Sequence, residues 1–260
     1  MKDTATEFTD IDVAAFRRDG YLVVRSLADD DTCARMSSVA AEHLAESLAP
    51  VEYEVDVKYP GAPSDPEGEG GRTVRRLLHA YARHAVYRDW ATSGAIASRL
   101  ARLFDSDAVE LSQCHHNCIM TKQPGYSSAT LWHQDNRYWS FDHQDLISVW
   151  LALGDETKSN GCLRVLPGSH LLEIEPGRFD AALFLRTDLA ENKSLVSTAR
   201  TVELNRGDVL FFHSRLFHAA GRNLTDEIKY SLVFTYHEAS NRPIEGTRSA
   251  KFPGVLLTPS

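Results

Sequence analysis

Apolar positions in the first hundred residues recur at the three- and four-residue spacing that predicts amphipathic helices. A short helix is expected after Thr9, where Val13 and Phe16, together with Ile11, share one apolar face. The other elements expected here are a strand at residues 21–24, a helix from the acidic residues 29–31 to Pro50, and one or two helices within residues 76–104. Residues 1–108 are therefore predicted to be mostly helical.

From residue 109 the pattern changes to short runs of β-branched, aromatic and other apolar residues broken by Gly, Pro and Asp. Such runs predict strands at short intervals, as in a β-sandwich or barrel. The expected strands are Leu111–Lys122, Leu146–Leu153, Cys162–Leu166, Thr201–Leu204, Val209–His213 and Lys229–His237. The predicted fold class is mainly β with flanking helices. We expect one domain over residues 1–260, with the β core at 109–240.

Two segments lack a clear period. Residues 59–71 are rich in Pro, Gly, Ser and acidic residues, which is loop composition and long enough for a weakly ordered flap. Residues 171–200 are a second candidate for a lid over a site. Binding specificity is therefore expected to lie in these two segments.

Composition limits the partners and the compartment. The formal net charge is −8 and the basic residues are scattered, so a nucleic-acid surface has little support and a small-molecule partner is favoured. Four cysteines without a Cys-x-x-Cys pair favour reduced thiols over a disulfide framework. The first ten residues are acidic and polar, unlike a secretory signal, and no stretch is apolar enough to span a membrane. We expect a cytoplasmic monomer or small homo-oligomer.

The first candidate for chemistry is the pair His133 and Asp135. On an extended strand, residues two apart project to the same side and can reach one metal ion. Such a pair is weak by itself, because matches occur by chance in a chain with eleven histidines. A third ligand must come from elsewhere, and His218 stands beyond the apolar strand Val209–His213. Two imidazoles and one carboxylate on one face of iron leave open positions for a cosubstrate and O2.

Two rival metal interpretations are less favoured. His213 lies within the alternation of its strand, which is more typical of a packed, hydrogen-bonded histidine than of a ligand. The run from Cys114 to Cys118 contains zinc-type ligands. On a strand, however, Cys114, His116 and Cys118 face one way, and buried thiols in a β core are the better interpretation.

Three stretches together resemble the phytanoyl-CoA dioxygenase family of Fe(II)/2-oxoglutarate-dependent oxygenases. They are WHQDNRYW at 132–139, SVWLALGDETKSNGCLRVLPGSH at 148–170 and GDVLFFHSRLFHAAGRN at 207–223. The opening FRRDGYLVVRSL at 16–27 is also similar, so the resemblance covers nearly the whole chain. It implies a double-stranded β-helix, the jelly roll of cupin-like proteins, in which His133, Asp135 and His218 bind Fe(II). It also implies 2-oxoglutarate and O2 as cosubstrates.

The cosubstrate end departs from the family pattern. An arginine eleven residues after the second histidine normally pairs with the far carboxylate of 2-oxoglutarate, and this chain has Lys229 there. Because lysine is a point charge and not a bidentate fork, Ser231 on the same strand face is expected to help. Trp150 and Cys118 match positions that line the cosubstrate pocket, while Ala220 replaces a usual serine. The alternatives are that Lys229 is an exposed edge lysine and that Trp150 only fills the core.

The expected activity is hydroxylation of an unactivated C–H bond of a small molecule, with release of succinate and CO2. Asp135 favours hydroxylation over chlorination, because the related halogenases lack this carboxylate; desaturation, epoxidation and ring closure stay open. The residues expected to form the substrate pocket are Asn136, Arg137, Tyr138, Trp139 and Arg76. Two rival functions remain, a metal-dependent cupin enzyme that does not use 2-oxoglutarate and a non-catalytic jelly-roll binding protein.

Overall fold

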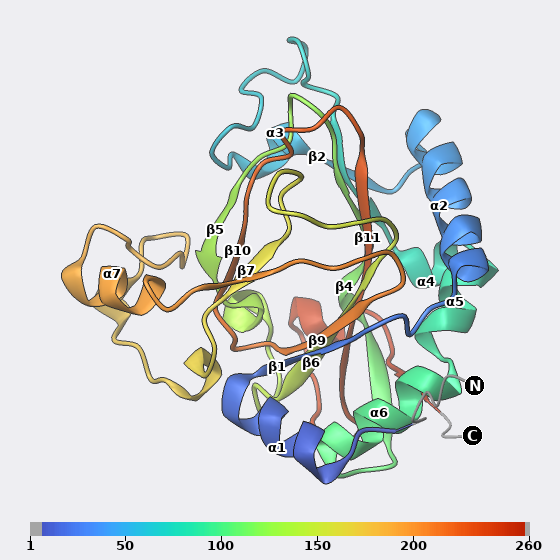
Figure 1. Cartoon of the computed structure of the whole chain (residues 1–260), viewed down its shortest axis with the longest axis vertical. Coiled ribbons are helices and arrows are strands. Elements are labelled where there is room, and N and C mark those ends of the chain that lie inside the picture. The colour runs from blue at the N-terminus through green and yellow to red at the C-terminus, as the bar shows by residue number, and fades with distance from the viewer. Residues whose placement is uncertain (1–6, 258–260) are drawn as a thin grey trace.

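The computed structural model describes residues 7–257, which form two antiparallel β-sheets that face each other (Figure 1). In spatial order, the large sheet contains β1 (Tyr21–Val24), β9 (Val209–His213), β6 (Leu146–Ala152), β11 (Lys229–Glu238), β4 (Val109–Lys122), β3 (Val74–Leu78) and β2 (Val51–Tyr53), with β12 (Val255–Leu256) paired to β4. The small sheet contains β5 (Thr130–His133), β10 (His218–Ala220), β7 (Leu163–Val165) and β8 (Arg200–Val202). The predicted jelly-roll fold is confirmed.

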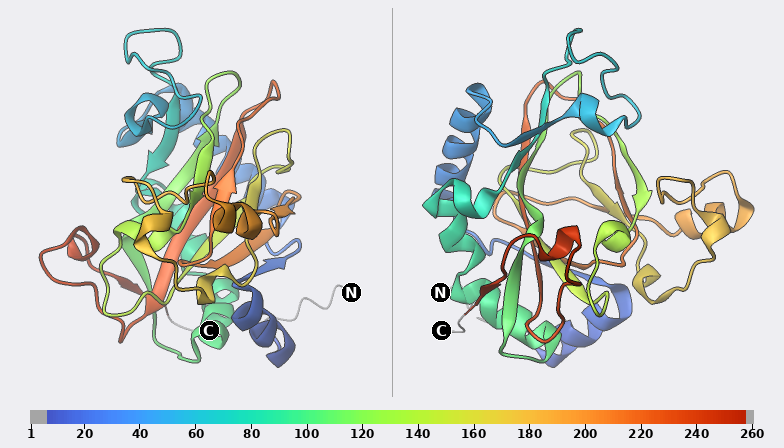
Figure 2. Two further views of the ribbon diagram at one scale, coloured as in Figure 1. Left: turned by 90° about the vertical axis from the view of Figure 1, so that its left-hand side faces the viewer. Right: turned by 180° about the vertical axis from the view of Figure 1, so that it is seen from behind.

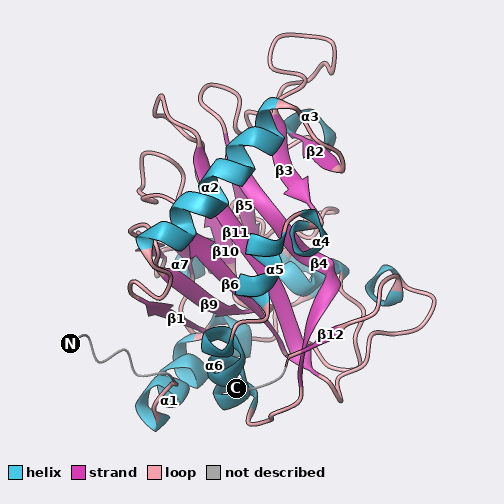
Figure 3. Ribbon diagram, turned by 90° about the vertical axis from the view of Figure 1, so that its right-hand side faces the viewer, coloured by secondary structure: helices cyan, strands magenta, loops and turns pink. Residues whose placement is uncertain are grey.

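Helices cover the outer face of the large sheet (Figure 3). They are α1 (Asp10–Asp19), α2 (Asp30–Ala45), α4 (Ala80–Arg83), α5 (Ala85–Ala91) and α6 (Gly94–Phe104). Met36 and Leu100 from these helices are fully buried in one cluster with Phe211 and Phe234 of the sheet. Across residues 7–257, the helices are too short or too polar to cross a bilayer.

Alternation along β11 separates the helix-covered face of the large sheet from the space between the sheets. Leu232 and Phe234 pack in the cluster beneath the helices, whereas Val233 packs with residues of the small sheet. Lys229, with the same parity as Val233, lines the cavity between the sheets. The alternation therefore places Lys229 on the inner face of the large sheet.

The region 74–104 differs from the prediction of one or two helices. Residues 74–78 form strand β3, which pairs with β2 on one side and β4 on the other. Three short helices follow, where one or two were expected. The apolar spacing alone did not distinguish a buried strand from a helix, because both give runs of buried residues over so short a length. With β1, the part expected to be mostly helical contributes three strands to the large sheet.

Two helix details also differ. Ile11 is 81% exposed and does not share the buried face of Val13 and Phe16. Helix α2 ends at Ala45 and does not reach Pro50. The chain leaves the helix at Ser47, which has a positive φ of 47°, and proline disfavours a helical residue before it.

Both segments predicted as loops lie outside the sheets (Figure 2). Residues 59–71 form turns after the short helix α3 (Glu54–Val57). Residues 171–200 contain a helix that was not predicted, α7 (Ala190–Val196), and a 3-10 turn, Pro176–Arg178; another 3-10 turn, Ser169–Leu171, leads into the segment. A further 3-10 turn, Arg248–Ala250, lies near the end of the described chain.

Candidate metal centre

Three side chains converge at the end of two neighbouring strands. His133 is the last residue of β5, His218 is the first of β10, and the two residues are directly paired across the small sheet. Asp135 begins a 3-10 turn (Asp135–Tyr138), and its backbone N–H donates to the carbonyl of Ser214 at 3.0 Å. The spacing argument placed both residues on one extended strand; instead Asp135 follows the strand, and the turn brings its carboxylate to the two imidazoles.

The spacing of the three groups suits one metal ion. Asp135 Oδ1 lies 3.7 Å from His133 Nε2 and 3.5 Å from His218 Nε2. Donor atoms that share an ion at about 2.1 Å lie about 3 to 3.5 Å apart. Within residues 7–257, no other three His, Cys, Asp or Glu side chains bring ligand atoms within 4.8 Å of one another. Two imidazole nitrogens and one carboxylate oxygen fit ferrous iron and leave coordination positions open.

Both imidazoles are oriented by the same local contact. His133 Nδ1 lies 2.8 Å from the carbonyl of Leu131, and His218 Nδ1 lies 3.0 Å from the carbonyl of Leu216. Because a carbonyl only accepts, each Nδ1 carries the proton and each Nε2 presents a lone pair to the centre. Burial lowers the pKa of His133 to about 3, with a further contribution from His218. The neutral imidazole that metal binding requires is therefore favoured.

Two side chains of the large sheet orient Asp135. Its Oδ2 accepts a hydrogen bond from Ser148 Oγ at 3.4 Å and lies 3.4 Å from His116 Nδ1. Burial acts to raise the pKa of Asp135, but the close contacts with His116, His218 and His133 outweigh it and hold the pKa well below its usual range. The carboxylate is thus ionised and directed at the imidazoles. Neither Ser148 nor His116 was predicted as a site residue.

Lys229 lies inside the barrel and is paired with a carboxylate that the sequence analysis missed. Its Nζ donates to Glu156 Oε2 at 3.0 Å and to Ser231 Oγ at 2.9 Å. Ser231 Oγ and Trp150 Nε1 donate to Glu156 Oε1 at 2.5 and 2.9 Å. Lys229 is 5% exposed and Glu156 is fully buried, so Lys229 is not an exposed edge lysine. The one sequence signal for Glu156 was that a lysine inside a barrel requires an anion.

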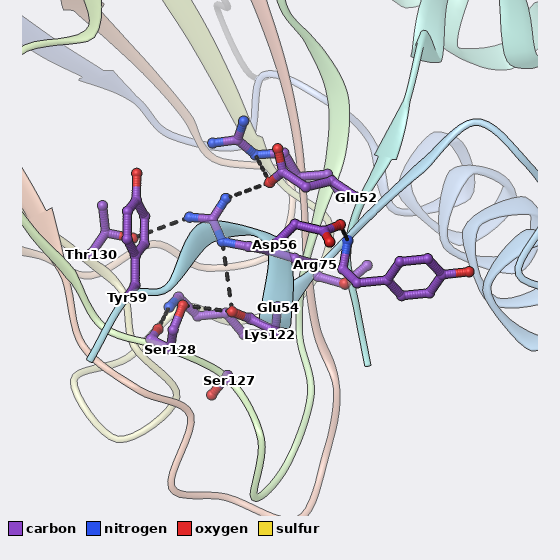
Figure 4. A network of polar contacts seen from close by, with 12 residues as sticks. Glu52, Glu54, Asp56, Tyr59, Arg75, Lys122, Ser127, Ser128 and Thr130 are labelled. Atoms are coloured by element: carbon purple, nitrogen blue, oxygen red, sulfur yellow. Dashed lines mark hydrogen bonds and ion pairs between the residues drawn. The ribbon is translucent and has the colours of Figure 1, made fainter. Parts of the chain in front are cut away.

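A cavity between the sheets joins the triad to a cluster of cations. Its lining includes the three triad residues, the cations Arg75, Arg76, Lys122 and Lys229, and the carboxylate Glu54. Figure 4 shows part of this cluster, in which Arg75 pairs with Glu52 at 2.9 Å and with Glu54 at 3.7 Å. Lys122 Nζ donates to the carbonyl of Ser128 at 2.8 Å. The cavity thus offers an anionic molecule several positive groups.

The other predicted pocket residues divide into those that reach this cavity and those that do not. Trp150 and Arg76 line it, as does Ala220. Cys118 and Ser231 are buried but do not line it. Ser231 instead hydrogen-bonds to Glu156, and Cys118 Sγ lies 3.7 Å from the sulfur of Met120, which takes its place in the cavity wall.

The four residues after Asp135 were predicted to form a substrate pocket, and none of them lines this cavity. Trp139 stacks on His115 with ring centroids 4.6 Å apart, whereas Tyr138 is 54% exposed. The reason is the 3-10 turn, which directs these side chains away from the gap between the sheets. Asn136 is only partly exposed, and its Oδ1 is buried without a hydrogen-bond partner among the described residues.

Arg137 instead connects the two loop segments near the triad. Its guanidinium donates to the carbonyl of Ala182 at 3.1 Å and to Tyr59 Oη at 3.0 Å, and it lies 4.2 Å above the ring of Phe184. The Phe184 ring packs at 5.9 Å from His133. Residues of both predicted loop segments therefore meet beside the first histidine of the triad.

The two rival metal sites considered from the sequence, at His213 and in the run 114–118, do not form among the described residues. His213 pairs with Asp145 at 3.3 Å and hydrogen-bonds to the backbone of Arg215, as expected for a packed histidine. The run 114–118 lies where the pairing of β4 and β11 shifts register, so its strict alternation is lost. All four cysteines are buried and unpaired, as free thiols.

Comparison with protein families gives a match to the model described as phytanoyl-CoA dioxygenase (PhyH) over residues 16–231. The chain is 31% identical over 128 residues to the peroxisomal phytanoyl-CoA dioxygenase of Homo sapiens, covering 45% of this chain and 37% of that protein. It is 24% identical over 246 residues to ectoine dioxygenase of Sphingopyxis alaskensis, covering 88% of this chain and 76% of that protein. The chain spans about half or less of the length of the first curated relatives that it matches.

Solved structures give the same picture of the fold. The epimerase SnoN, determined with Fe3+, alpha-ketoglutarate and nogalamycin RO, is similar with a TM-score of 0.70 and 25% identity, covering 89% of this chain and 84% of that chain. EctD from S. alaskensis, determined with 2-oxoglutarate and 5-hydroxyectoine, has a TM-score of 0.74 and 22% identity, covering 94% of this chain and 80% of that chain. At that identity the likeness to EctD concerns the fold alone.

Proposed function

Because the chain belongs to the phytanoyl-CoA dioxygenase family, we propose that it is an Fe(II)- and 2-oxoglutarate-dependent dioxygenase that hydroxylates a C–H bond of a small molecule. Succinate and CO2 are the other products. The observation that carries the proposal is the buried triad, in which two Nε2 atoms and one carboxylate oxygen face one point. The proposed ligands are His133, Asp135 and His218.

The residues of the chain have separate tasks in this reaction. The bound ferrous ion supplies O2 activation coupled to decarboxylation of the 2-oxo acid. The carbonyls of Leu131 and Leu216 keep both imidazoles in the ligating tautomer. Asp135 keeps a carboxylate at the centre, in the position that a halide would need, which supports hydroxylation over halogenation. The packed walls between the sheets exclude water from the reacting groups.

The test of the metal and cosubstrate assignment is spectroscopic. Anaerobic addition of Fe(II) and 2-oxoglutarate should give the wild type a weak visible metal-to-ligand absorption band. His133→Ala should abolish the band because it removes one ligand, whereas His213→Ala, a histidine outside the triad, should retain it. A wild type without the band would contradict the proposal.

The test of hydroxylation is the mass of the product. A screen of small molecules, read out as 2-oxoglutarate-dependent succinate formation, identifies the substrate, and hydroxylation then adds one oxygen atom to it. Since SnoN is described as an epimerase, a product of unchanged mass is a real alternative outcome. Unchanged mass, or a loss of two hydrogens, would show that the reaction is not hydroxylation.

Two observations favour a second candidate, a metal-dependent cupin enzyme that does not use 2-oxoglutarate. The charge of Lys229 is already balanced by Glu156, and Ala220 offers no side-chain hydrogen bond to a cosubstrate. The two candidates differ in stoichiometry. Turnover that produces one succinate for each product excludes the second candidate, and turnover without 2-oxoglutarate supports it.

A further inference from the structure

Arg76 of β3 has hydrogen-bond donors that the protein does not use, unlike its neighbour Arg75. The guanidinium of Arg75 donates to Glu52 at 2.9 Å and to Thr130 Oγ1 at 3.4 Å. Arg76 makes an ion pair with the same Glu52 oxygen, from its Nε at 3.4 Å. Within residues 7–257, no acceptor forms a hydrogen bond with this guanidinium, and its Nε is buried without one. Since buried donors are almost always paired in folded proteins, those of Arg76 indicate a ligand.

The side chain of Arg76 is one wall of the cavity that holds the triad. Arg76 is the Cα partner of Met120 in the pairing of β3 and β4, and both residues line the cavity. The side chain of Arg76 is 23% exposed. In the large sheet β4 lies between β3 and β11, so Arg76 is two strands away from Lys229. Arg76 is thus a positive group separate from the buried pair of Lys229 and Glu156.

Arg76 also lies within electrostatic reach of the metal centre. Burial acts to lower its pKa, but the charge of Glu52, with contributions that include Asp135, raises the pKa above its usual value. Burial lowers the pKa of His116 to about 4; the charge of Asp135 opposes this effect and that of Arg76 adds to it. His116 Nδ1 is 3.4 Å from Asp135 Oδ2, and His116 lines the same cavity. Arg76 therefore faces the part of the cavity next to the proposed iron ligands.

The cavity wall is not polar throughout. Met120, Leu163 and Ala220 line it together with the ring of Trp150. These side chains can contact a hydrocarbon group but cannot neutralise a charge. A molecule that fits both the apolar wall and Arg76 has an apolar part and one anionic group.

We propose that Arg76 binds a carboxylate of the primary substrate, which is therefore an organic acid. The proposal rests on the proposed function, because it names the substrate class of that same site. A guanidinium can donate two parallel hydrogen bonds to one carboxylate. Because Arg76 shares Glu52 with Arg75, it matches a singly charged group better than a phosphate dianion. In this arrangement the carboxylate is held at β3 and the hydrocarbon part of the acid lies against the apolar wall.

The experiment screens matched pairs, each a carboxylic acid beside its primary amide, which has nearly the same size and no charge. Acids should support 2-oxoglutarate-dependent succinate formation with a kcat/KM at least about tenfold above that of their amides. Arg76→Met should lower kcat/KM for the acid by about 10- to 100-fold, chiefly through KM, and should change the rate with the amide little. Arg76→Lys, which keeps the charge but not the planar fork, should lie between the two.

The variant has a matched control and is expected to fold. Glu52 keeps its hydrogen bond to Arg75 in Arg76→Met, so no buried carboxylate loses its last partner. Arg72→Met, which removes an exposed pair with Glu67 just before β3, is the control and should behave as wild type. Arg76→Gln is judged by the same criteria where the methionine variant does not fold.

The Kd for 2-oxoglutarate separates substrate binding from cosubstrate binding. Followed by the visible band of the anaerobic Fe(II) protein, it should stay within a few-fold of wild type in Arg76→Met. Four results overturn the role of Arg76 and leave the proposed function intact: an equal loss for acid and amide, turnover of neutral molecules only, turnover of no acid, or a Kd for 2-oxoglutarate raised as strongly as KM. A wild type that gives no band overturns the proposed function itself.

Discussion

At the residue scale, Glu156 holds three polar side chains in place on the inner face of the large sheet. Its two oxygens accept hydrogen bonds from Lys229, Ser231 and Trp150, and it is fully buried. A carboxylate with three donors is a good partner for one buried ammonium. Because it fixes both the cation and the indole, Glu156 acts on ligand binding through its neighbours and is a positioning residue.

Glu156→Gln should destabilise the protein. The substitution leaves the buried Lys229 uncompensated, so the free energy of unfolding should fall by about 3 kcal/mol. Fe(II) with 2-oxoglutarate should recover more stability in this variant than in wild type, because the ligand then provides the missing negative charge. Urea unfolding with and without the ligands, under anaerobic conditions, measures both quantities. Glu203→Gln, at an exposed carboxylate, is the control; an equal effect there would contradict the expectation.

Because Lys122 lines the cavity, the affinity for 2-oxoglutarate should depend on pH through its charge. Burial and the charges of Lys229 and Arg75 together lower the pKa of Lys122 to about 7, against the opposing effect of Glu54 and Glu156. A bound carboxylate favours the protonated form. Affinity should therefore be highest below pH 7 and fall above it, by up to about tenfold per pH unit. Titrations at pH 6.5 and 8.5 check this, and Lys122→Arg, which stays charged, should lose the dependence.

The site was predictable from the sequence to unequal degrees. The three metal ligands His133, Asp135 and His218 were identified from the sequence, because each lies in a stretch that resembles the family. Glu156 was not found, because it stands in a loop with no apolar period. Lys122 was only noted as the end of a strand, and nothing in the sequence indicated that it would face Lys229.

At the scale of elements, the turn between β6 and β7 is tightly constrained at Gly161. Gly161 has a φ of +80°, and a Cβ there would lie 2.5 Å from the carbonyl oxygen of Gly221. Glycine at position 161 is therefore required both by the backbone conformation and by the close packing of two loops. It also lines the cavity.

Gly161→Ala should lower the free energy of unfolding by about 1 to 3 kcal/mol, because alanine is strained at positive φ and meets a backbone oxygen. Gly177→Ala is the control, since a Cβ at Gly177 has open space around it and no positive φ. Denaturation in urea measures the difference between the two variants. Equal stabilities would mean that the Gly161 loop shifts without cost.

Elements with a strong period were predicted best. Strand β9 (Val209–His213) agrees at both ends, and β4, β6 and β11 agree within two residues. The short strands β5 and β10, which carry the histidines, were not predicted as such, because three or four residues show no period. Their existence depends on pairing with each other across the small sheet.

At the scale of the whole molecule, two loop segments far apart in the chain meet beside the triad. Arg137 bonds to Tyr59 of one segment and to the backbone of Ala182 in the other. The ring of Tyr59 packs edge-on against Phe184 at 5.3 Å. The backbone N–H of Leu185 donates to the carbonyl of Trp132, which ties the second segment to β5.

Arg137→Ala should loosen both segments together, since it removes contacts to each. Amide hydrogen exchange at residues 59–62 and 180–185 should become about 5- to 10-fold faster, whereas the core strands should be unchanged. Arg186→Ala, which removes an exposed pair with Asp188 in the same region, is the control. Faster exchange in only one segment would show that Arg137 does not couple the two.

The division of the site between the two sheets has one further consequence. The imidazoles belong to β5 and β10, whereas Lys122 and Lys229 belong to β4 and β11 of the opposite sheet. The gap between the sheets is fixed by buried side chains such as Val165 and Leu210. If iron holds one end of the 2-oxo acid and a lysine of the large sheet holds the other, the distance between the sheets limits the length of the acid that fits. Apolar residues that touch neither end of the ligand would then determine whether 2-oxo acids of four or six carbons bind.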